Sequence, residues 1–158
     1  SPYPGEGPRY RCGGPGPLPF PPAHRPGDNR AVPPRISDDD GRLALAACLT
    51  AHAAGSEPAR RELLTAVRWT LGLLAEAHPG RSVEVRVPPA GAVQVIEGVR
   101  HVRGTPPNVV EMNPRTWLAL AAGERDWTHA VGAGHVLASG TRADLADYLP
   151  LPQLVQER

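Results

Sequence analysis

Residue types that would mark a particular class of protein are scarce in this chain of 158 residues. Lysine is absent, so all 17 basic residues are arginine, and the formal net charge is only +1. A chain so close to neutral has no overall field that favours nucleic acid or an anionic membrane. The only cysteines, Cys12 and Cys48, suggest no disulfide framework. We therefore expect a protein of the reducing cytoplasm that does not bind nucleic acid.

Long apolar runs are also missing. The longest ones, such as residues 71–75, are far shorter than the roughly 20 residues that a membrane-spanning helix needs. The amino end has no basic region followed by an apolar block, which a secretory signal would require. The sequence therefore predicts neither a transmembrane segment nor a secretory signal.

The motifs of catalytic and cofactor sites are absent as well. No Gly-x-Ser-x-Gly sequence positions a nucleophile, and His101, His129 and His135 occur without His-x-x-x-His or Cys-x-x-Cys spacing. Gly132 and Gly134 resemble part of a dinucleotide-binding loop, but a third glycine is missing and a strand should follow instead of a helix. We expect no catalytic residue, no metal site and no cofactor, and we predict that the protein is not an enzyme.

Proline and glycine dominate the first 34 residues. Such a stretch lacks backbone donors and periodic apolar residues, so the sequence predicts an extended or disordered arm over residues 1–34. The folded domain should cover residues 35–158. A few apolar side chains could still anchor the arm on a protein partner, since proline-rich chains lose little entropy on docking. These residues are Tyr3, Tyr10, Leu18 and Phe20.

Two helices are predicted at the start of the folded domain. Ser37, followed by three aspartates, is typical of a helix N-cap, and this helix should run to about Ala54. A second helix should begin within residues 56–58 and continue to about Ala77. Its apolar residues cover more than half of the circumference. We expect it to lie between two layers, or to face both a core and an apolar cavity.

The period of the apolar residues then changes from that of a helix to that of a strand. Residues 82–87 alternate strictly, and residues 92–97 are apolar on both faces, as in a central strand. Further strands are predicted at 99–103, 108–112 and 135–139. Helices are predicted at 113–122 with Asn113 as the N-cap, from 126 with Asp126 as the N-cap, and at 141–149. The fold class is therefore α+β, with a mainly antiparallel, four- to five-stranded sheet covered by helices on one face.

Short motifs stand out in the carboxyl-terminal half. They are WLALAAG at 117–123, Asp126-Trp127, Gly134-His135-Val136 and Ser139-Gly140-Thr141. This order of a helix, a glycine, a short helix and a glycine-led strand resembles the end of sterol carrier protein domains. Residues 83–89 and the run RHVRGTPPN at 100–108 are similar to the small bacterial branch of that family. The resemblance covers about residues 37–151.

The resemblance implies a shell of sheet and helices around a tunnel for fatty acyl chains, sterols or similar ligands, without a cofactor. Burying sixteen carbons at ~0.8 kcal/mol per methylene gives a gross gain on the order of 10 kcal/mol. We predict non-catalytic binding or transfer of such a ligand. The residues expected to line the tunnel, the last two as a lid, are Leu64, Val67, Leu71, Leu74, Val93, Val95, Val110, Trp117, Val131, Leu145 and Leu149.

Arg100, His101 and Arg103 are the candidates for contact with the headgroup of the ligand. His101 and Arg103 share one face of an extended segment, where they could bind a carboxylate or phosphate. The alternative is that they form a solvated strand edge protected by charge.

The sequence also suits a solid core and two different functions. The wide apolar arc of the second helix could pack between two layers without leaving a cavity. The chain would serve as an interaction or adaptor subunit of a larger complex if its proline-rich arm docks on a partner. Similar domains also accompany catalytic ones, so an accessory domain related to a thiol-dependent isomerase is a third function to test.

Overall fold

In the computed structural model, the described part of the chain comprises residues 35–98 and 108–155. The arm expected at 1–34 and the strand expected at 99–103 lie outside it. The first two elements are helices, as predicted: α1 (Asp38–Ala53) and α2 (Arg60–Ala77). The Ser37 hydroxyl accepts a hydrogen bond from the backbone N–H of Asp40 at 3.1 Å, which confirms the predicted cap of α1.

Helices α1 and α2 pack closely because a glycine stands where they meet. A Cβ added to Gly41 would lie 2.1 Å from the indole ring of Trp69. The indole Nε1 donates to Asp38 Oδ1 at 3.0 Å, so the two helices also share a polar contact.

Helix α2 begins later than predicted. Ser56 does not cap it, because the Ser56 hydroxyl donates instead to the Ala51 carbonyl of α1 at 3.1 Å.

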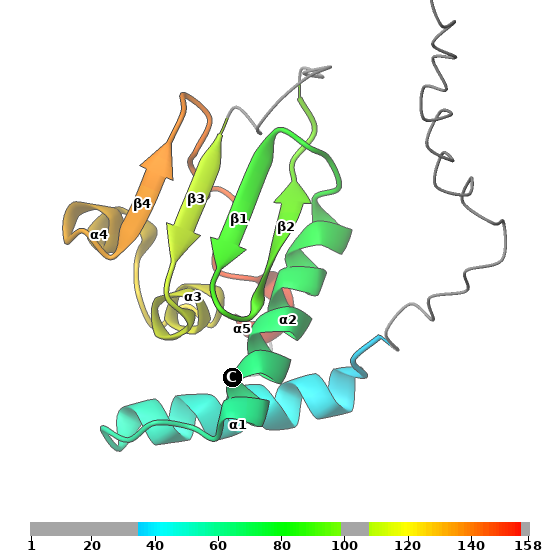
Figure 1. The fold of residues 1–158 in the computed structure, drawn as a ribbon, viewed down its shortest axis with the longest axis vertical. Coiled ribbons are helices and arrows are strands. Elements are labelled where there is room, and N and C mark those ends of the chain that lie inside the picture. Colours follow the sequence, from blue (N-terminus) through cyan, green and yellow to red (C-terminus); the bar gives the residue numbers. More distant parts are fainter. Residues whose placement is uncertain (1–34, 99–107, 156–158) are drawn as a thin grey trace, which may run out of the picture. The chain divides into compact units, whose positions relative to one another are not determined.

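Four strands form one sheet in the described part of the chain. They are β1 (Val83–Val87), β2 (Gly91–Val95), β3 (Val109–Met112) and β4 (Val136–Ser139). Their order across the sheet is β2-β1-β3-β4 (Figure 1). The outer pairs are antiparallel, but β1 and β3 at the centre are parallel. The sheet is therefore mixed, which corrects the mainly antiparallel prediction, and a fifth strand is unconfirmed.

Among the described strands, β2 lies at an edge of the sheet, so the central position predicted for residues 92–97 is not confirmed. Ala92 is exposed there, while Val95 is fully buried. The residues that flank this strand are bonded to α2 or to its C-cap. The Ile96 N–H donates to the His78 carbonyl at 2.8 Å, and Arg68 Nε donates to the Ala90 carbonyl, also at 2.8 Å.

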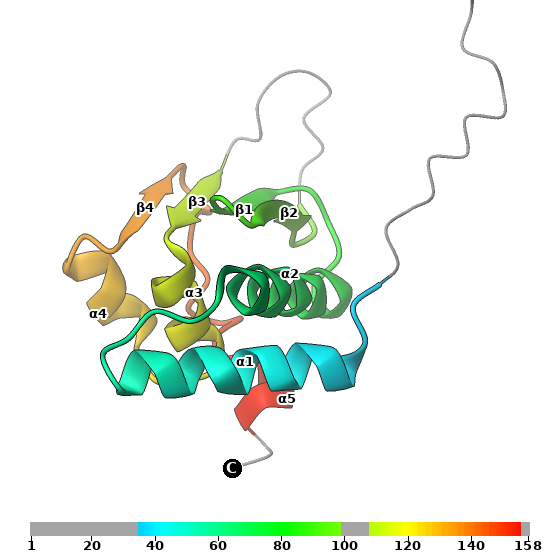
Figure 2. The ribbon, with the colours of Figure 1, turned by 60° about the horizontal axis from the view of Figure 1, so that its bottom comes forward.

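One face of the sheet is apolar and covered by helices. The three inward valines of β1 are fully buried, as their alternation predicts. Figure 2 shows α1, α2 and α3 (Pro114–Ala121) on the same side of the sheet. Glu84 and Arg86 alternate with the valines and therefore point to the opposite face, which we call the outer face.

Two further predicted N-caps are confirmed in the carboxyl-terminal half. Asn113 Oδ1 accepts the backbone N–H of Thr116 at 2.8 Å and starts α3. Asp126 Oδ2 accepts the N–H of His129 at 2.9 Å and starts α4 (Trp127–Gly132).

The helix predicted at 141–149 was wrong. Residues 140–151 form turns and irregular backbone, and only the short helix α5 (Pro152–Val155) follows. Two backbone N–H groups of this segment are bonded to side chains instead. Asn108 Oδ1 accepts the N–H of Arg142 at 2.9 Å, and Asp144 Oδ1 accepts the N–H of Ala146 at 2.8 Å. We call residues 140–151 the strap.

Candidate functional site

Most residues expected to line a tunnel lie in the hydrophobic core between sheet and helices. Those buried in the core are Val67, Leu71, Leu74, Val95, Val110, Trp117 and Leu145. Three more, Leu64, Val93 and Leu149, are partly buried and pack against the core. Val131 lies apart from them on α4, with 37% of its surface exposed. All but one of the predicted side chains are therefore brought together.

A polar contact inside this core joins α2 to α3. Trp117 Nε1 donates to Thr70 Oγ1 at 2.8 Å, and both residues are fully buried. The Thr70 hydroxyl donates in turn toward the carbonyls of Ala66 and Val67, at 2.8 and 3.0 Å. The donor of Trp117 is thus satisfied away from water, as a buried tryptophan requires. Thr70 was not among the predicted residues, because nothing in the local pattern shows which residue faces Trp117.

The strap closes the core between β4 and α5 (Figure 1). Leu145 at its middle is fully buried, and Leu151 at its end is 1% exposed. The Leu151 N–H donates to the Ala121 carbonyl of α3 at 2.9 Å. The ring of Tyr148 packs edge-on against that of His78, with centroids 4.7 Å apart. Side-chain packing therefore holds most of the strap, with backbone bonds to the rest of the domain near its two ends.

Asn108 fastens the first end of the strap to the sheet. Its side chain is buried, and Nδ2 donates to the Ser82 carbonyl at 2.8 Å while Oδ1 accepts the N–H of Arg142. Ser82 and Asn108 directly precede β1 and β3, so the hydrogen bond between them links the starts of the two parallel strands. Residues 99–107, which carry the headgroup candidates Arg100, His101 and Arg103, lie outside the described part of the chain.

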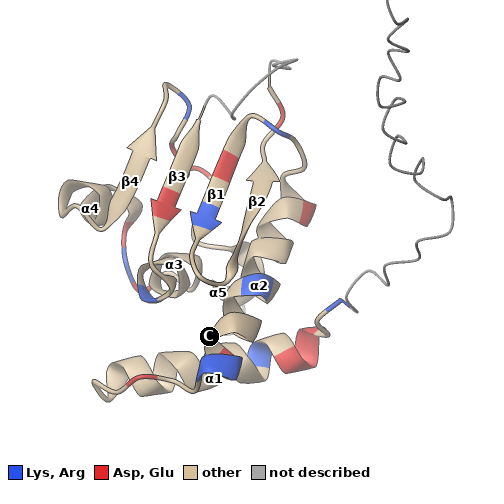
Figure 3. Cartoon of the chain, in the orientation of Figure 1, with Lys and Arg blue, Asp and Glu red and all other residues tan. Residues whose placement is uncertain are grey.

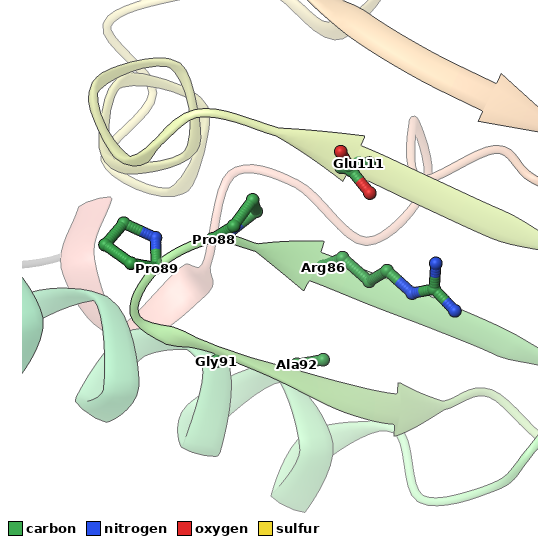
Figure 4. Close-up of a pocket in the computed structure, with 6 residues that line it drawn as sticks. All are labelled: Arg86, Pro88, Pro89, Gly91, Ala92 and Glu111. Atoms are coloured by element: carbon green, nitrogen blue, oxygen red, sulfur yellow. The ribbon is translucent and has the colours of Figure 1, made fainter.

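The outer face of the sheet bears an open depression that was not predicted. It has a volume of about 340 Å³ and is lined by Arg86, Pro88, Pro89, Gly91, Ala92 and Glu111 (Figure 4). Arg86 Nε donates to Glu84 on the same strand, and this bond, together with the charges of Glu84 and Glu111, raises the pKa of Arg86. The guanidinium is therefore held among carboxylates within the sheet surface.

Two described residues, Cys48 and His52, have pKa values that burial shifts. Burial, with a smaller effect of Glu62, raises the pKa of the Cys48 thiol to about 11, so the thiol stays protonated. Burial and the charge of Arg115 lower the pKa of His52. Among residues 35–98 and 108–155, no group of three or more His, Cys, Asp or Glu side chains could hold a metal ion. Within the same ranges, no helix has the length and apolarity to cross a membrane.

Comparison with protein families agrees with this fold. A family described as bacterial orthologues of sterol carrier protein matches residues 59–151, which is more than half of the chain. The chain belongs to this family. The match includes α2, the whole described sheet and the strap, and ends at Leu151. Comparison with functionally curated proteins finds no match.

Proposed function

We propose that this protein binds an apolar, lipid-like molecule between its sheet and its helices, and carries it without chemical conversion. Its family supports this proposal, since sterol carrier-like proteins generally bind lipids and do not act as catalysts. The observation that carries it is the shared location of the predicted lining residues in one apolar core under an irregular cover.

Entry of a ligand requires part of this cover to move. Leu71 and Trp117 on the facing helices are at most 2% exposed, so the chain's own side chains fill the space around them. The strap is the part of the cover without regular secondary structure, and its leucines supply apolar contacts that an acyl chain can replace. A ligand would therefore replace the contacts that Leu145 and Leu149 make with the core. The net free energy of binding would then be smaller than the full burial of the ligand alone would give.

A polar headgroup would remain near the surface. We propose Arg100, His101 and Arg103 for its contact, because guanidinium and imidazolium groups form charge-assisted hydrogen bonds with carboxylate and phosphate. An Arg103→Ala variant should then bind a fatty acid more weakly at low salt, with a smaller difference at high salt. Equal affinities at every salt concentration would assign these residues to a solvated surface instead.

The test that needs no variant is a series of saturated fatty acids of increasing length. If each added methylene is buried, it contributes ~0.8 kcal/mol, which is about a fourfold tighter Kd. We expect affinity to rise along the series and then level off when the interior is full. Native mass spectrometry with organic extraction would identify what co-purifies. Affinity that does not depend on chain length would contradict binding in an apolar interior.

A matched pair of variants locates the ligand within the domain. Leu71→Trp adds bulk between α2 and the rest of the core, so it should reduce uptake of a fluorescent fatty acid strongly. Leu43→Trp adds the same side chain on α1, where Leu43 is 72% exposed, and should leave uptake unchanged. Circular dichroism would check that both variants fold. Unchanged uptake by a folded Leu71→Trp variant would place the ligand elsewhere.

A further inference from the structure

In the part of the chain that the structure describes, strand β4 lies at an edge of the sheet and lacks the features that usually protect such edges. It consists of Val136, Leu137, Ala138 and Ser139, with no charged residue and no proline, and Figure 3 shows it free of the charges that mark β1 and β3. Leu137 is 68% exposed, and Ala138 is exposed as well. Exposed, uncharged edge strands readily pair with another strand, and charges or prolines normally prevent this.

The hydrogen-bond pattern of the sheet determines which backbone groups of β4 point outward, away from β3. The Glu84 N–H donates to the Asn108 carbonyl at 2.9 Å, so in the parallel pair Val110 directs both its N–H and its C=O toward β1. The neighbouring residues of β3 then face β4, where Glu111 is paired with Leu137. Along β4, Val136 and Ala138 consequently direct their N–H and C=O groups outward, away from the sheet.

We propose that β4 is a homodimer interface, at which the β4 strands of two copies pair antiparallel about a two-fold axis through Leu137. In this register Val136 of each copy exchanges two backbone hydrogen bonds with Ala138 of the other. The two Leu137 residues then form a non-hydrogen-bonded pair, in which side chains approach most closely. Both four-stranded sheets join into one continuous sheet with all helices on the same side.

The side chains around β4 fit a second copy of this chain. Identical strands can meet without repulsion because β4 carries no charge, and the exposed Leu137 side chains cover each other. On the helix side of the sheet, the pairing places Ala138 of one copy beside Val136 of the other. Val136 is the first residue of β4 and follows α4 closely in the chain. Val131 of α4 is itself 37% exposed, so it can cover the exposed Ala138 of the other copy.

At the other edge of the described sheet, the residues that flank β2 on both sides are already bonded to α2 or to its C-cap. Ile96 N–H donates to the His78 carbonyl, and Arg68 Nε donates to the Ala90 carbonyl. Soluble homo-oligomers are most often two-fold dimers, in which one surface meets itself. The proposed register satisfies that condition, because the two outward residues of β4, Val136 and Ala138, pair with each other across the two-fold axis.

Sedimentation velocity over a concentration series of the full chain tests the proposal. We expect a monomer–dimer equilibrium. Leu137→Asp places two carboxylates opposite each other and should raise the dimer Kd on the order of tenfold or more. Leu43→Asp, on the similarly exposed Leu43 of α1, is the control and should leave the dimer intact. A chain that stays monomeric at every soluble concentration, or a dimer that survives Leu137→Asp, overturns the proposal.

Crosslinking tests the two-fold axis itself. In a Cys12→Ser background, where the remaining Cys48 is buried, oxidation of a Leu137→Cys variant should give a covalent dimer. Ser139→Cys is the control, because the register sets position 139 opposite position 135 and far from its own counterpart. Crosslinking of Ser139→Cys at a rate equal to or above that of Leu137→Cys overturns the axis.

Discussion

The buried pair of Thr70 and Trp117 shows how one hydroxyl supports the packing of α2 against α3. A Thr70→Val substitution keeps the shape of the side chain but leaves Trp117 Nε1 without its acceptor. A buried donor without a partner costs about 1–3 kcal/mol, so the free energy of unfolding should fall by that amount. Urea denaturation followed by tryptophan fluorescence measures the change. Thr70→Ser retains the hydroxyl and should lose clearly less stability, and an equal loss in both variants would contradict the role of the hydrogen bond.

The Cys48 thiol makes stability depend on pH in the alkaline range. Burial raises its pKa from the ordinary value of 9.0 to about 11, so the folded state holds this proton more tightly than the unfolded state. The contribution of Cys48 to stability is fully present below pH 9.0 and is lost as the pH rises through about 11. We expect the unfolding free energy to fall more steeply with pH in the native chain than in a Cys48→Ala variant. Parallel pH profiles would contradict a raised pKa.

At the scale of elements, two helical glycines make a matched test of the contact between α1 and α2. An alanine normally stabilises a helix interior by about 0.5–1 kcal/mol over glycine. In α2, a Cβ at Gly72 would meet nothing within 4 Å, so Gly72→Ala should show this gain. In α1, a Cβ at Gly41 would lie 2.1 Å from Trp69, so Gly41→Ala should instead lose about 1–3 kcal/mol through overpacking. Thermal melts of both variants would reveal whether their effects have opposite signs.

The strap is an element whose mobility should depend on Asn108. Asn108→Ala removes both the bond to Ser82 and the bond to Arg142, so hydrogen exchange should become faster in residues 140–149 while the helices change less. If the strap covers the ligand site, fatty-acid uptake should also become faster. Arg81→Ala, which removes an exposed hydrogen bond to Gln94 on the sheet, is the control. Unchanged exchange in the strap would show that its side-chain packing alone holds it.

At the scale of the whole molecule, residues 1–34 and the folded domain should have separable roles. Arg35 forms an ion pair with Glu76 at 2.7 Å, so a truncated chain should keep Arg35 and begin there. We expect the truncated chain to fold and to take up fatty acid with unchanged affinity. Pull-down experiments with both forms would show whether the arm binds a partner. Loss of lipid uptake on truncation would contradict the division of the chain at residue 34.

The sequence by itself determined the elements whose signals are local. The caps at Ser37, Asn113 and Asp126 and the alternation of β1 were predictable, because each depends on residues a few positions apart. The apolar arc of α2 was also visible in the sequence, and Val67, Leu71 and Leu74 of this helix are buried. Membership of the family, suggested by motifs in the carboxyl-terminal half, was also confirmed.

Only the tertiary structure decided which remote groups meet. The order of the described strands depends on where β3 pairs, and the backbone N–H of Arg142 in the strap bonds to the side chain of Asn108. The Thr70–Trp117 bond and the outward groups of β4 likewise follow from the pairing of distant segments. Local propensities specify the elements, but strand order and the choice of buried partners minimise the free energy of the whole domain, which no short window of sequence contains.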